Sequence, residues 1–556
     1  MQRFLYFYGI NHALMIKYTP ANQLSLENFK TPFDNTLSPD NRWVKMSKII
    51  PWDNLASIYM KQLSNNSGRE SINVRMVIAA LIIKHKLGLD DRGTVDMISE
   101  NIYLQYFCGL SSFQTKKPFH PTVFVDIRKR MGATSFDKWN EMIIEKADKL
   151  KPKKERQINK NTSNNSDKVS EISENKDNTT KDKAKKHTNK GVLKIDATVA
   201  NQKIVYPTDA GLLNTARKES ERIIDMLYIQ SNYNKKPRTY RKIARTEYLN
   251  FSKNRRKSKK KIRKFIRKQL AYLKRNLSHI EELIDNIEEI KTDTRHSYIF
   301  PLSKRDQKIY WVLQNIYEQQ KYMYDTRTHS VKDRIVNIYQ PYVRPIPRGK
   351  DKASTEFGAK ISASEVDGMS RVENISWNNF NEAMDLDLQV EMFKKTFGHY
   401  PELLLADQIY LNKNNRKLLN IKGIRIVGKP LGRPKKEKLS AYQKRKLKKE
   451  RNQRNLIEGK FGQGKNAYGL GNIKAKRRDT SESWISAIFF IMNLITLLKV
   501  AEKSLFFYVL IKNTFLKLHF TILNFIKIRI LIFDFYFKEK IRNQQCFGLR
   551  KSASSI

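Results

Sequence analysis

Two short apolar runs that each end in an aspartate constrain the fold more than any other feature of the chain. They are VLKID, which ends at Asp196, and LLLAD, which ends at Asp407. LLLAD has the continuous apolar pattern of a parallel strand that is buried on both faces. In α/β sheets, sites form beyond the carboxyl ends of strands, so both aspartates are expected to lie near one site. The sequence therefore predicts a sheet covered by helices, with carboxylates at one edge.

A third acid, Glu458, lies within the basic stretch RNLIEGKFGQGK, in a predicted helix that follows the last strand signal. Arg454, Glu458 and Lys465 are spaced i, i+4 and i+11, which places them in one sector of an ideal helix. Glycines beyond Glu458 weaken the helix, so a loop at Lys465 is an alternative. Two interpretations remain: an ordinary ion pair on a surface helix, or a metal ligand whose basic neighbours, Lys460 included, contact phosphate.

The balance of charge indicates a polyanionic partner. The chain of 556 residues has 107 Lys and Arg against 55 Asp and Glu, which gives a formal net charge of +52. Nucleic acid is the usual partner of so basic a protein. The two cysteines, Cys108 and Cys546, exclude a disulfide framework and a cysteine-rich zinc module, and they favour a reducing, intracellular compartment.

Three acids in so basic a protein are what metal-assisted chemistry on DNA requires. Hard cations such as Mg²⁺ prefer oxygen ligands, usually one or two carboxylates with water and phosphate. Two such ions activate the attacking oxygen and stabilise the leaving oxygen during in-line displacement at phosphorus. Spacing alone is a weak signal, since a single Asp after a strand is more often a turn residue.

A polar segment, residues 151–190, divides the chain and is predicted to be a flexible linker or a disordered loop. Before it, residues 1–40 are interpreted as an N-terminal extension and residues 41–150 as a helical domain. Its strongest helix is VRMVIAALIIKHKLGL, which Asn73 opens and Gly88 closes. Several short helices with tight turns fit a helix-turn-helix reader of DNA and a plain helical bundle about equally.

After the linker the pattern is mixed, so the predicted class is α+β. GVLKIDAT and NQKIVYPT predict a β-hairpin. Residues 215–330 are predicted as a helical insertion within a domain that spans residues 191–500. Its longest helix has a face of Lys and Arg, which is either a solvated surface or a positive face over phosphates. DRIVNIYQPYVRPI and EFGAKISASE predict further strands.

Two apolar segments lie near the end of the chain. WISAIFFIMNLITLL, residues 484–498, is shorter than a bilayer span and is predicted to be a buried core helix. Residues 501–556 form an apolar and basic tail in which charged residues argue against a single transmembrane helix. The role of this tail is unassigned.

The residues around the three acids resemble a known family. Arg454, Glu458 and Lys465 are similar to the end of the Y-x2-R-x3-E-x6-K signature of bacterial insertion-sequence DDE transposases (the IS-four and IS-five groups). Arg451 stands where that signature has Tyr. KIDATVANQKIVYPTDAGLLNTAR resembles the family's first-aspartate block, and LLLADQIYLNKNNR resembles its second. The resemblance covers roughly residues 40–500.

The resemblance implies an RNase H-like catalytic core, a mixed sheet flanked by helices, after the helical DNA-binding domain. It implies that Asp196, Asp407 and Glu458 hold Mg²⁺ or Mn²⁺, and that Arg454 and Lys465 contact DNA or orient the helix of Glu458. The implied reaction is cleavage at the element ends by water, followed by attack of the freed 3′-OH on target DNA. The implied partners are double-stranded DNA, with its terminal inverted repeats, and further copies of the chain in a homodimer or larger assembly. The resemblance also implies that the protein is cytoplasmic, is associated with the bacterial nucleoid and does not bind a membrane.

Two alternatives remain for the function. An RNase H-like DNA endonuclease shares the first chemical step without strand transfer. A decayed, non-catalytic DNA-binding protein is consistent with Arg451 and with the unusual tail. No two of the nine histidines are spaced as metal ligands.

Other charged residues compete with the three acids. Asp209 in YPTDAG is predicted to shape a turn, and Asp367 in SEVDGM to lie in a loop. KPLGRPKKEK resembles a minor-groove AT-hook, with a solvated basic loop as the alternative. Its candidate DNA-binding residues are Arg433, Lys435 and Lys436.

Overall fold

The computed structural model describes residues 16–20, 29–31, 36–63, 70–150, 189–292, 300–350, 353–432, 440–504 and 529. The chain divides into two compact units, Met1–Ile144 with Ser173–Leu494, and Glu145–Ile172 with Ile495–Ile556. The sheet, its covering helices and the candidate site lie in the first unit. The predicted linker, residues 151–190, falls almost wholly outside the described residues.

The N-terminal region is helical, as predicted. Helix α3 begins after Asn73, whose side chain accepts a backbone N–H of the first turn, and it ends at Gly88, which has a φ of 67°. Trp43 and Trp52 both pack edge to face on Phe107. The helices are α1 (Arg42–Ile49), α2 (Trp52–Met60), α3 (Val74–Leu87), α4 (Asp91–Glu100), α5 (Ile102–Phe107), α6 (Val123–Arg130) and α7 (Ala133–Leu150).

Part of the predicted N-terminal extension packs against these helices. Phe29 and Leu37 are buried in one apolar cluster with Val44 and Tyr106. The backbone of Lys30 also pairs with the segment that follows α5. The helical core therefore includes residues from before position 41.

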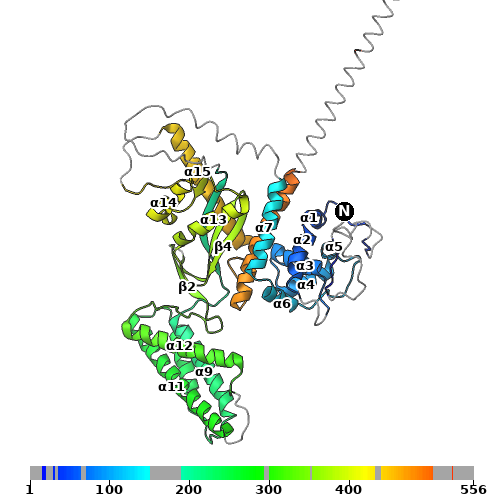
Figure 1. Ribbon diagram of the computed structural model, residues 1–556. Helices are drawn as coiled ribbons and strands as arrows, with labels where there is room; N and C mark the ends of the chain where they lie inside the picture. Colours follow the sequence, from blue (N-terminus) through cyan, green and yellow to red (C-terminus); the bar gives the residue numbers. More distant parts are fainter. Residues whose placement is uncertain are drawn as a thin grey trace, which may run out of the picture. The chain divides into compact units, whose positions relative to one another are not determined.

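One mixed sheet forms the centre of the second region, as predicted (Figure 1). The strand order is β2-β3-β1-β5-β6, and β4 also pairs with β3. β1 is central, antiparallel to β3 on one side and parallel to β5 on the other. Gly358 permits the close pairing of β3 with β1, because a Cβ at this position would lie 1.9 Å from the carbonyl oxygen of Ala200. The strands are β1 (Val192–Asn201), β2 (Arg344–Lys350), β3 (Ala353–Val366), β4 (Met369–Ser376), β5 (Leu403–Leu405) and β6 (Arg425–Ile426).

The predicted hairpin over GVLKIDAT and NQKIVYPT is wrong. β1 runs unbroken to Asn201 and pairs along most of its length with β3. Beyond it, Gln202 donates its backbone N–H to the Phe357 carbonyl of β3 and forms an isolated bridge with Ile473. The stretch has no turn residues such as Asn-Gly to reverse the chain, and β3 offers a longer partner. The strand signal in DRIVNIYQ also fails, since β2 begins only at Arg344.

Helices cover both faces of the sheet, which leaves one edge for a site. Because side chains alternate along a strand, Leu193 and Ile195 of β1 pack on the face of α13 and α14. Val192 lies in a different cluster with Leu447 of α15, so the even-numbered residues of β1 point toward α15. The elements are η3 (Glu382–Asp385), α13 (Leu386–Phe397), η4 (Gln408–Tyr410), α14 (Lys413–Ile421) and α15 (Ala441–Ala467).

A long apolar helix spans Arg478–Ser504, and its residues up to Leu494 belong to the first unit. Among the described residues it is long and apolar enough to cross a membrane, yet 78% of its most apolar window is buried in the protein. Its Asn493 amide donates to Asn140 of α7 at 3.0 Å and to the Ser370 carbonyl of β4 at 2.6 Å. The predicted burial of residues 484–498 is confirmed.

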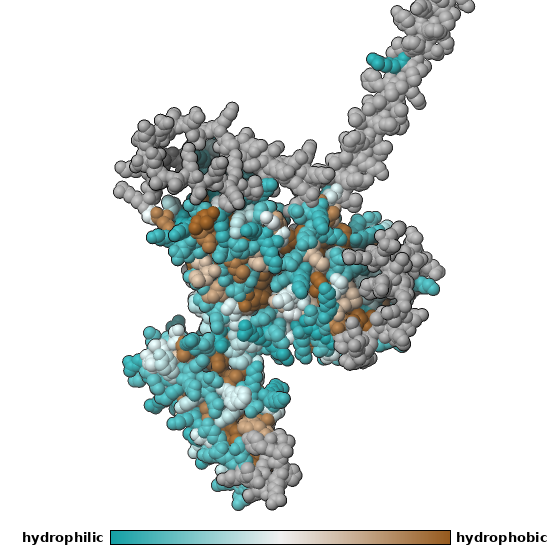
Figure 2. Space-filling view, in the orientation of Figure 1, coloured by the Kyte–Doolittle hydropathy of each residue, from teal (hydrophilic) through white to brown (hydrophobic). Residues whose placement is uncertain are grey.

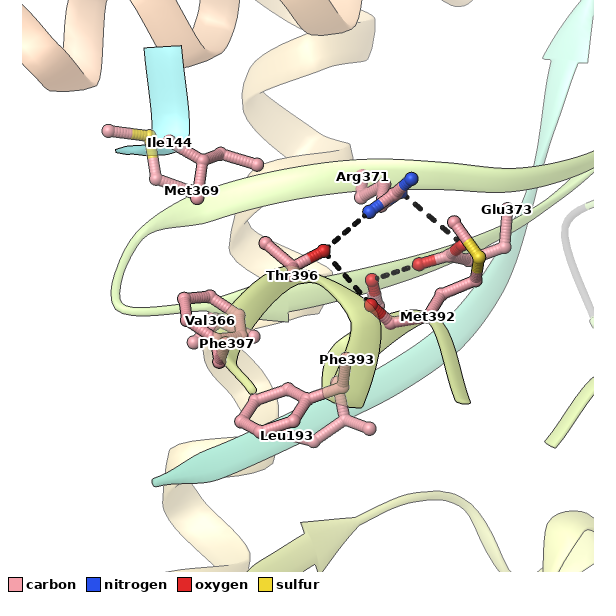
Figure 3. Close-up of a pocket in the computed structure, with 11 residues that line it drawn as sticks. Ile144, Leu193, Val366, Met369, Arg371, Glu373, Met392, Phe393, Thr396 and Phe397 are labelled. Atoms are coloured by element: carbon pink, nitrogen blue, oxygen red, sulfur yellow. Dashed lines mark hydrogen bonds and ion pairs between the residues drawn. The ribbon is translucent and has the colours of Figure 1, made fainter. Parts of the chain in front are cut away.

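A second polar contact joins α7, β4 and α13, and Figure 3 shows its part between β4 and α13. Arg371 of β4 donates to Thr396 at 2.8 Å and to Glu141 at 2.9 Å. Beside it, Glu373 accepts a hydrogen bond of 2.6 Å from Ser364. The cavity here measures about 20 Å³, which suits a single water and no larger ligand.

Burial raises the pKa of Glu373 to about 7, although Arg371 acts in the opposite direction. The unfolded glutamate has its ordinary pKa of 4.5. Between these values the folded protein keeps the proton that the unfolded chain releases, so stability falls as the pH rises from 4.5 to 7. In the wild type the free energy of unfolding should fall by about 2 to 3 kcal/mol across this window, and in Glu373→Gln this fall should be absent. Denaturant unfolding at pH 4.5, 6 and 8 measures both. The same change at exposed Glu318 is the control, and equal pH profiles for both variants would contradict the assignment.

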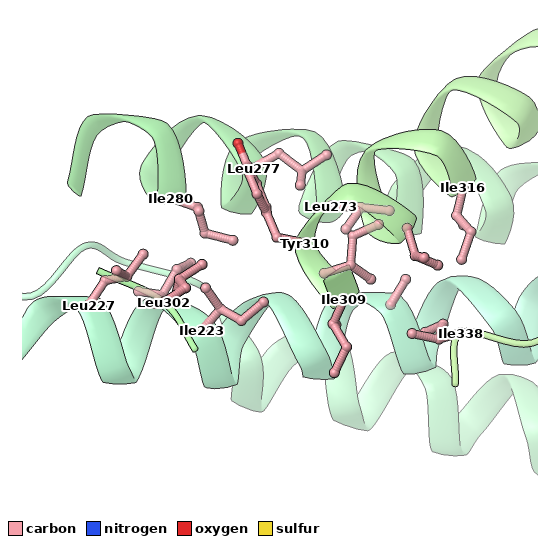
Figure 4. Close-up of a cluster of buried hydrophobic side chains, with 14 of the residues drawn as sticks. Ile223, Leu227, Leu273, Leu277, Ile280, Leu302, Ile309, Tyr310, Ile316 and Ile338 are labelled. Carbon is pink, nitrogen blue, oxygen red and sulfur yellow. The ribbon is translucent and has the colours of Figure 1, made fainter. Parts of the chain in front are cut away.

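The helical insertion has a core of its own (Figure 4). Leu273, Leu277 and Ile280 of α11 pack between Ile223 of α9 and Ile309 of α12. The insertion begins earlier than predicted, because α9 starts at Asp209. Its helices are α9 (Asp209–Tyr228), α10 (Arg241–Lys253), α11 (Lys259–Thr292) and α12 (Lys304–Thr326).

Candidate active site

Asp196 lies in the middle of β1. The prediction that it ends a strand is wrong. Its backbone pairs with Ala363 of β3. As an even-numbered residue of β1 it points toward α15, and its side chain is 17% exposed. One carboxylate oxygen accepts the backbone N–H of Ala197 at 2.8 Å. The strand continues past Asp196 because β3 is long enough to pair with it.

Asp407 follows β5 by two residues, as predicted, and lies on the same cleft as Asp196. The cleft has a volume of about 730 Å³ and is lined mainly by polar atoms. One oxygen of Asp407 accepts the backbone N–H of Gln408 at 2.7 Å and caps the short helix η4. Since β1 and β5 are parallel neighbours, the fold brings these two distant aspartates to one edge of the sheet.

Glu458 is connected to Asp196 by Arg454, which contacts both carboxylates. The helix α15 continues through the glycines to Ala467, so the loop alternative is wrong. The Arg454 guanidinium lies 2.8 Å from a Glu458 oxygen and 3.9 Å from an Asp196 oxygen. The predicted i,i+4 ion pair therefore exists, and its cation also contacts the first acid.

Burial raises the pKa of Asp196 to about 6, while the Ala197 N–H and the Arg454 guanidinium act in the opposite direction. The nearby carboxylates of Glu382 and Glu458 add to the rise. Arg454 therefore compensates the negative charge only in part. A carboxylate in this setting gains more from an added cation than an exposed one does.

The donor chemistry of the cleft fits a divalent cation, but the three acids are not gathered around one point. Carboxylate oxygens of Asp196 and Asp407 suit Mg²⁺, which binds through one or two carboxylates with water and phosphate. Within the part of the chain that the structure describes, no three His, Cys, Asp or Glu side chains are close enough to hold a metal ion. The Glu458 carboxylate is half exposed and is turned toward Arg454. Its role as a third ligand requires that ion pair to open.

Two family models match parts of the chain. The model described as a transposase domain (DUF772) matches residues 31–130, which contain α1 to α6. The model described as a transposase DDE domain matches residues 404–495, which contain Asp407 and Glu458. The chain has the domains of a DDE transposase. The predicted family of DDE transposases is confirmed, but these matches do not assign the chain to the IS-four or IS-five groups.

Neither transposase match covers β1 or the insertion, so the role of Asp196 stays a prediction. The chain is also 26% identical over 119 residues to the uncharacterized protein ORF8 in the nfe locus of Rhizobium meliloti. That stretch is 21% of this chain and 57% of that protein, so the match spans just over half of the relative. No solved structure matches the chain.

The basic residues predicted to bind DNA have different surroundings. Lys465 lies in the last turn of α15, 3.3 Å from the Glu356 carboxylate of β3. Lys460 is half-buried on the same helix, and Arg451 is exposed one turn before Arg454. The remaining predicted DNA-binding residues, Arg433, Lys435 and Lys436, lie outside the described residues.

Sequence reasoning missed two charged residues of the cleft, Lys360 and Glu382. The Lys360 ammonium is 3.0 Å from a Glu382 oxygen, and it donates to the Phe380 carbonyl at 2.8 Å and to Asn379 at 3.1 Å. A lysine amid the small and apolar residues of GAKISAS was an available signal for Lys360. Nothing in the polar stretch NNFNEAMD singles out Glu382.

The two competing acids have structural roles. Asp209 is the first residue of α9, where a turn had been predicted, and it accepts hydrogen bonds from Gln320 at 2.9 Å and Arg334 at 2.7 Å. Asp367 and Gly368 both have positive φ, 50° and 84°, in the tight turn between β3 and β4. The prediction of a loop at Asp367 is confirmed, and neither acid lines the cleft of Asp196.

Proposed function

We propose that the chain is an insertion-sequence transposase of the IS-four or IS-five type that cuts DNA at element ends and joins the freed ends to target DNA. One observation carries the proposal: Asp196 and Asp407 line one cleft, and Arg454 links Asp196 to Glu458. The match of a transposase DDE domain to residues 404–495 supports it.

The order of the strands supports an RNase H-like core for this transposase. The first acid lies on the central strand β1, and the second follows β5, the parallel neighbour of β1. The third acid lies on α15, which packs on one face of both strands. The insertion α9–α12 separates the first acid from the others in the sequence and lies outside the sheet.

Asp196 and Asp407, with Glu458 as the third ligand, would hold Mg²⁺ or Mn²⁺ through carboxylate oxygens. A divalent cation bound there supplies positive charge against the charge that develops on the phosphoryl group during in-line displacement. Without the cation, Arg454 keeps the Glu458 carboxylate near Asp196 and reduces the repulsion between the two acids. Glu458 would become a ligand when this ion pair opens. Water attacks phosphorus first and the bond to the 3′ oxygen breaks; the resulting 3′-OH then attacks a phosphodiester of the target.

The substrate under this proposal is double-stranded DNA, both the terminal inverted repeats and the target. The net charge of +52 supports a polyanionic substrate. Residues 41–150 act as the helical reader of the repeats, and Lys460 and Lys465 contact DNA beside the cut. Synapsis of two ends requires a homodimer or a larger assembly. The site of action is the nucleoid in the bacterial cytoplasm, without a membrane.

The test is cleavage of a duplex that carries the flanking inverted repeat, with Mg²⁺ and with Ca²⁺. Wild type, Glu458→Gln and Glu402→Gln are compared, because Glu402 is an exposed acid at the opposite end of β5 from Asp407. We expect cutting that requires Mg²⁺, is retained by Glu402→Gln and is lost by Glu458→Gln, while both variants still bind the duplex.

Two results would overturn parts of the proposal. Binding without cutting by the wild type would favour the decayed, DNA-binding alternative. Cutting without joining, when a duplex with a preformed 3′-OH end is incubated with a target plasmid, would favour the endonuclease alternative.

A further inference from the structure

We propose that the junction of α10 and α11 in the insertion is a binding surface for the phosphate backbone of double-stranded DNA. This inference rests on the proposed function, because it names a part of the chain that holds the substrate DNA away from the cleft. The surface, called the basic corner below, consists of Arg255, Arg256, Lys260, Lys264, Arg267 and Lys274.

Four residues of the basic corner, Lys260, Lys264, Arg267 and Lys274, form a strip on the side of α11 that faces away from the insertion core, and Arg255 and Arg256 precede this helix. Lys260, Lys264 and Arg267 are spaced i, i+4 and i+7, so they lie in one sector of the helix. Phe265 and Leu270, which lie on the other side, are buried in the insertion. All six side chains of the basic corner are exposed. From Lys260 to Lys274 the strip runs about 20 Å along the helix, a length over which DNA presents many phosphates.

The charge of the basic corner is not neutralised by the protein. The chain has no Asp or Glu between Tyr248 and Ile280. Among the residues that the structure describes, none of the six forms an ion pair. Other cations of the insertion do form them: Lys236 and Arg241 pair with Asp225 at 2.6 Å. Among the described residues, the basic corner therefore gathers six exposed cations without an ion pair, four of them in one sector of a single helix.

The start of α11 adds to the excess of positive charge. A helix N-terminus carries partial positive charge and is stabilised by acidic side chains. The first turn of α11 has no acid and instead contains Lys259, Lys260 and Lys261. This arrangement is unfavourable for the isolated helix, and a bound polyanion would offset it. Figure 2 shows that the visible face of the insertion is mainly hydrophilic, with scattered hydrophobic residues.

The test measures DNA binding by the full chain in EDTA, where no cutting occurs. The variant carries Arg255→Gln, Arg256→Gln, Lys260→Gln and Lys264→Gln. The matched control carries Lys304→Gln, Arg305→Gln, Lys308→Gln and Lys332→Gln, three exposed cations of α12 and one in the segment that follows it, all outside the basic corner. Fluorescence anisotropy with a labelled duplex is recorded over a series of salt concentrations, and thermal unfolding checks that both proteins fold.

We expect the basic-corner variant to bind the duplex at least about tenfold more weakly and to lose about 0.9 from the slope of log K against log salt for each phosphate contact removed. The control should change both quantities much less. Equal effects in the two variants would overturn the proposal. It would also be overturned if the wild type bound a duplex RNA more tightly than the duplex DNA and only the basic-corner variant lost that RNA binding. The proposed function is tested separately, by DNA cleavage in Mg²⁺. Its failure can therefore be distinguished from failure of this inference, which is tested by DNA binding in EDTA.

Discussion

The Asp196→Asn protein is expected to lose cleavage of element-end DNA by roughly 10³-fold or more, equivalent to about 4 kcal/mol of transition-state stabilisation. The amide keeps the size of the side chain and can still accept the Ala197 N–H. It removes the negative charge that, in the proposed function, holds the cation. The loss is measured as the rate of strand cutting in saturating Mg²⁺, with DNA binding measured in parallel.

The same substitution is expected to stabilise the fold. Burial raises the pKa of Asp196 to about 6, so the folded protein holds this proton more tightly than the unfolded chain does. Stability is therefore lost as the pH rises from about 4 to 6, whereas the substituted amide carries no charge at any pH. Asp196→Asn should raise the free energy of unfolding by about 2 to 3 kcal/mol at pH 8 and by little at pH 4.

A matched control is Asp367→Asn, the same change in the exposed turn between β3 and β4, where the left-handed backbone also accepts asparagine. It should leave both cutting and stability near the wild-type values. Two results would remove Asp196 from the proposed site. One is an Asp196→Asn protein that still cuts DNA; the other is an Asp196→Asn protein that is less stable than the wild type at pH 8.

The second large effect is expected for Lys194→Met, which should lower the free energy of unfolding by about 3 to 5 kcal/mol. Lys194 of β1 lies 2.8 Å from Glu365 of β3, and the two side chains are 6% and 1% exposed. They are direct cross-strand partners. Loss of the lysine leaves a carboxylate buried without its cation, which costs more than the intact pair contributes.

Denaturant unfolding of three further proteins separates this explanation from a simple loss of packing. The double variant Lys194→Met with Glu365→Met should regain most of the stability, since no charge is then left buried. Lys45→Met, which breaks an exposed pair with Asp40, should change stability by less than about 1 kcal/mol. The third protein is the wild type, measured under the same conditions. If the double variant is as unstable as Lys194→Met alone, the buried charge is not the cause.

Local patterns predicted the parts of the fold that depend on near neighbours. The ends of α3 follow from Asn73 and Gly88, whose backbone preferences act within one turn. The apolar run LLLAD identified β5 as a parallel strand, because such a strand is buried on both faces. The hairpin failed since a strand pattern does not specify its partner, and β1 pairs with β3 from beyond the insertion.

The candidate site shows the same limit. Asp407 and Glu458 belong to short motifs that can be recognised one at a time. Asp407 lines the cleft, whereas Glu458 is joined to Asp196 only by way of Arg454. Glu382 enters the cleft only because η3, which follows β4, meets Lys360 in the middle of β3. No local spacing encodes that meeting. The contact of Arg454 with Asp196 likewise depends on how α15 lies across the sheet.

The position of the insertion sets an order of assembly during synthesis. β1 is made before α9–α12, and both strands that pair with it are made afterwards. The insertion has mostly local contacts and can fold first, whereas the central strand must wait for partners that are distant in the sequence. The ribosome-bound chain therefore holds Asp196 long before Asp407 and Glu458 exist. Under the proposed function, a chain whose synthesis stops early can bind DNA but cannot cut it.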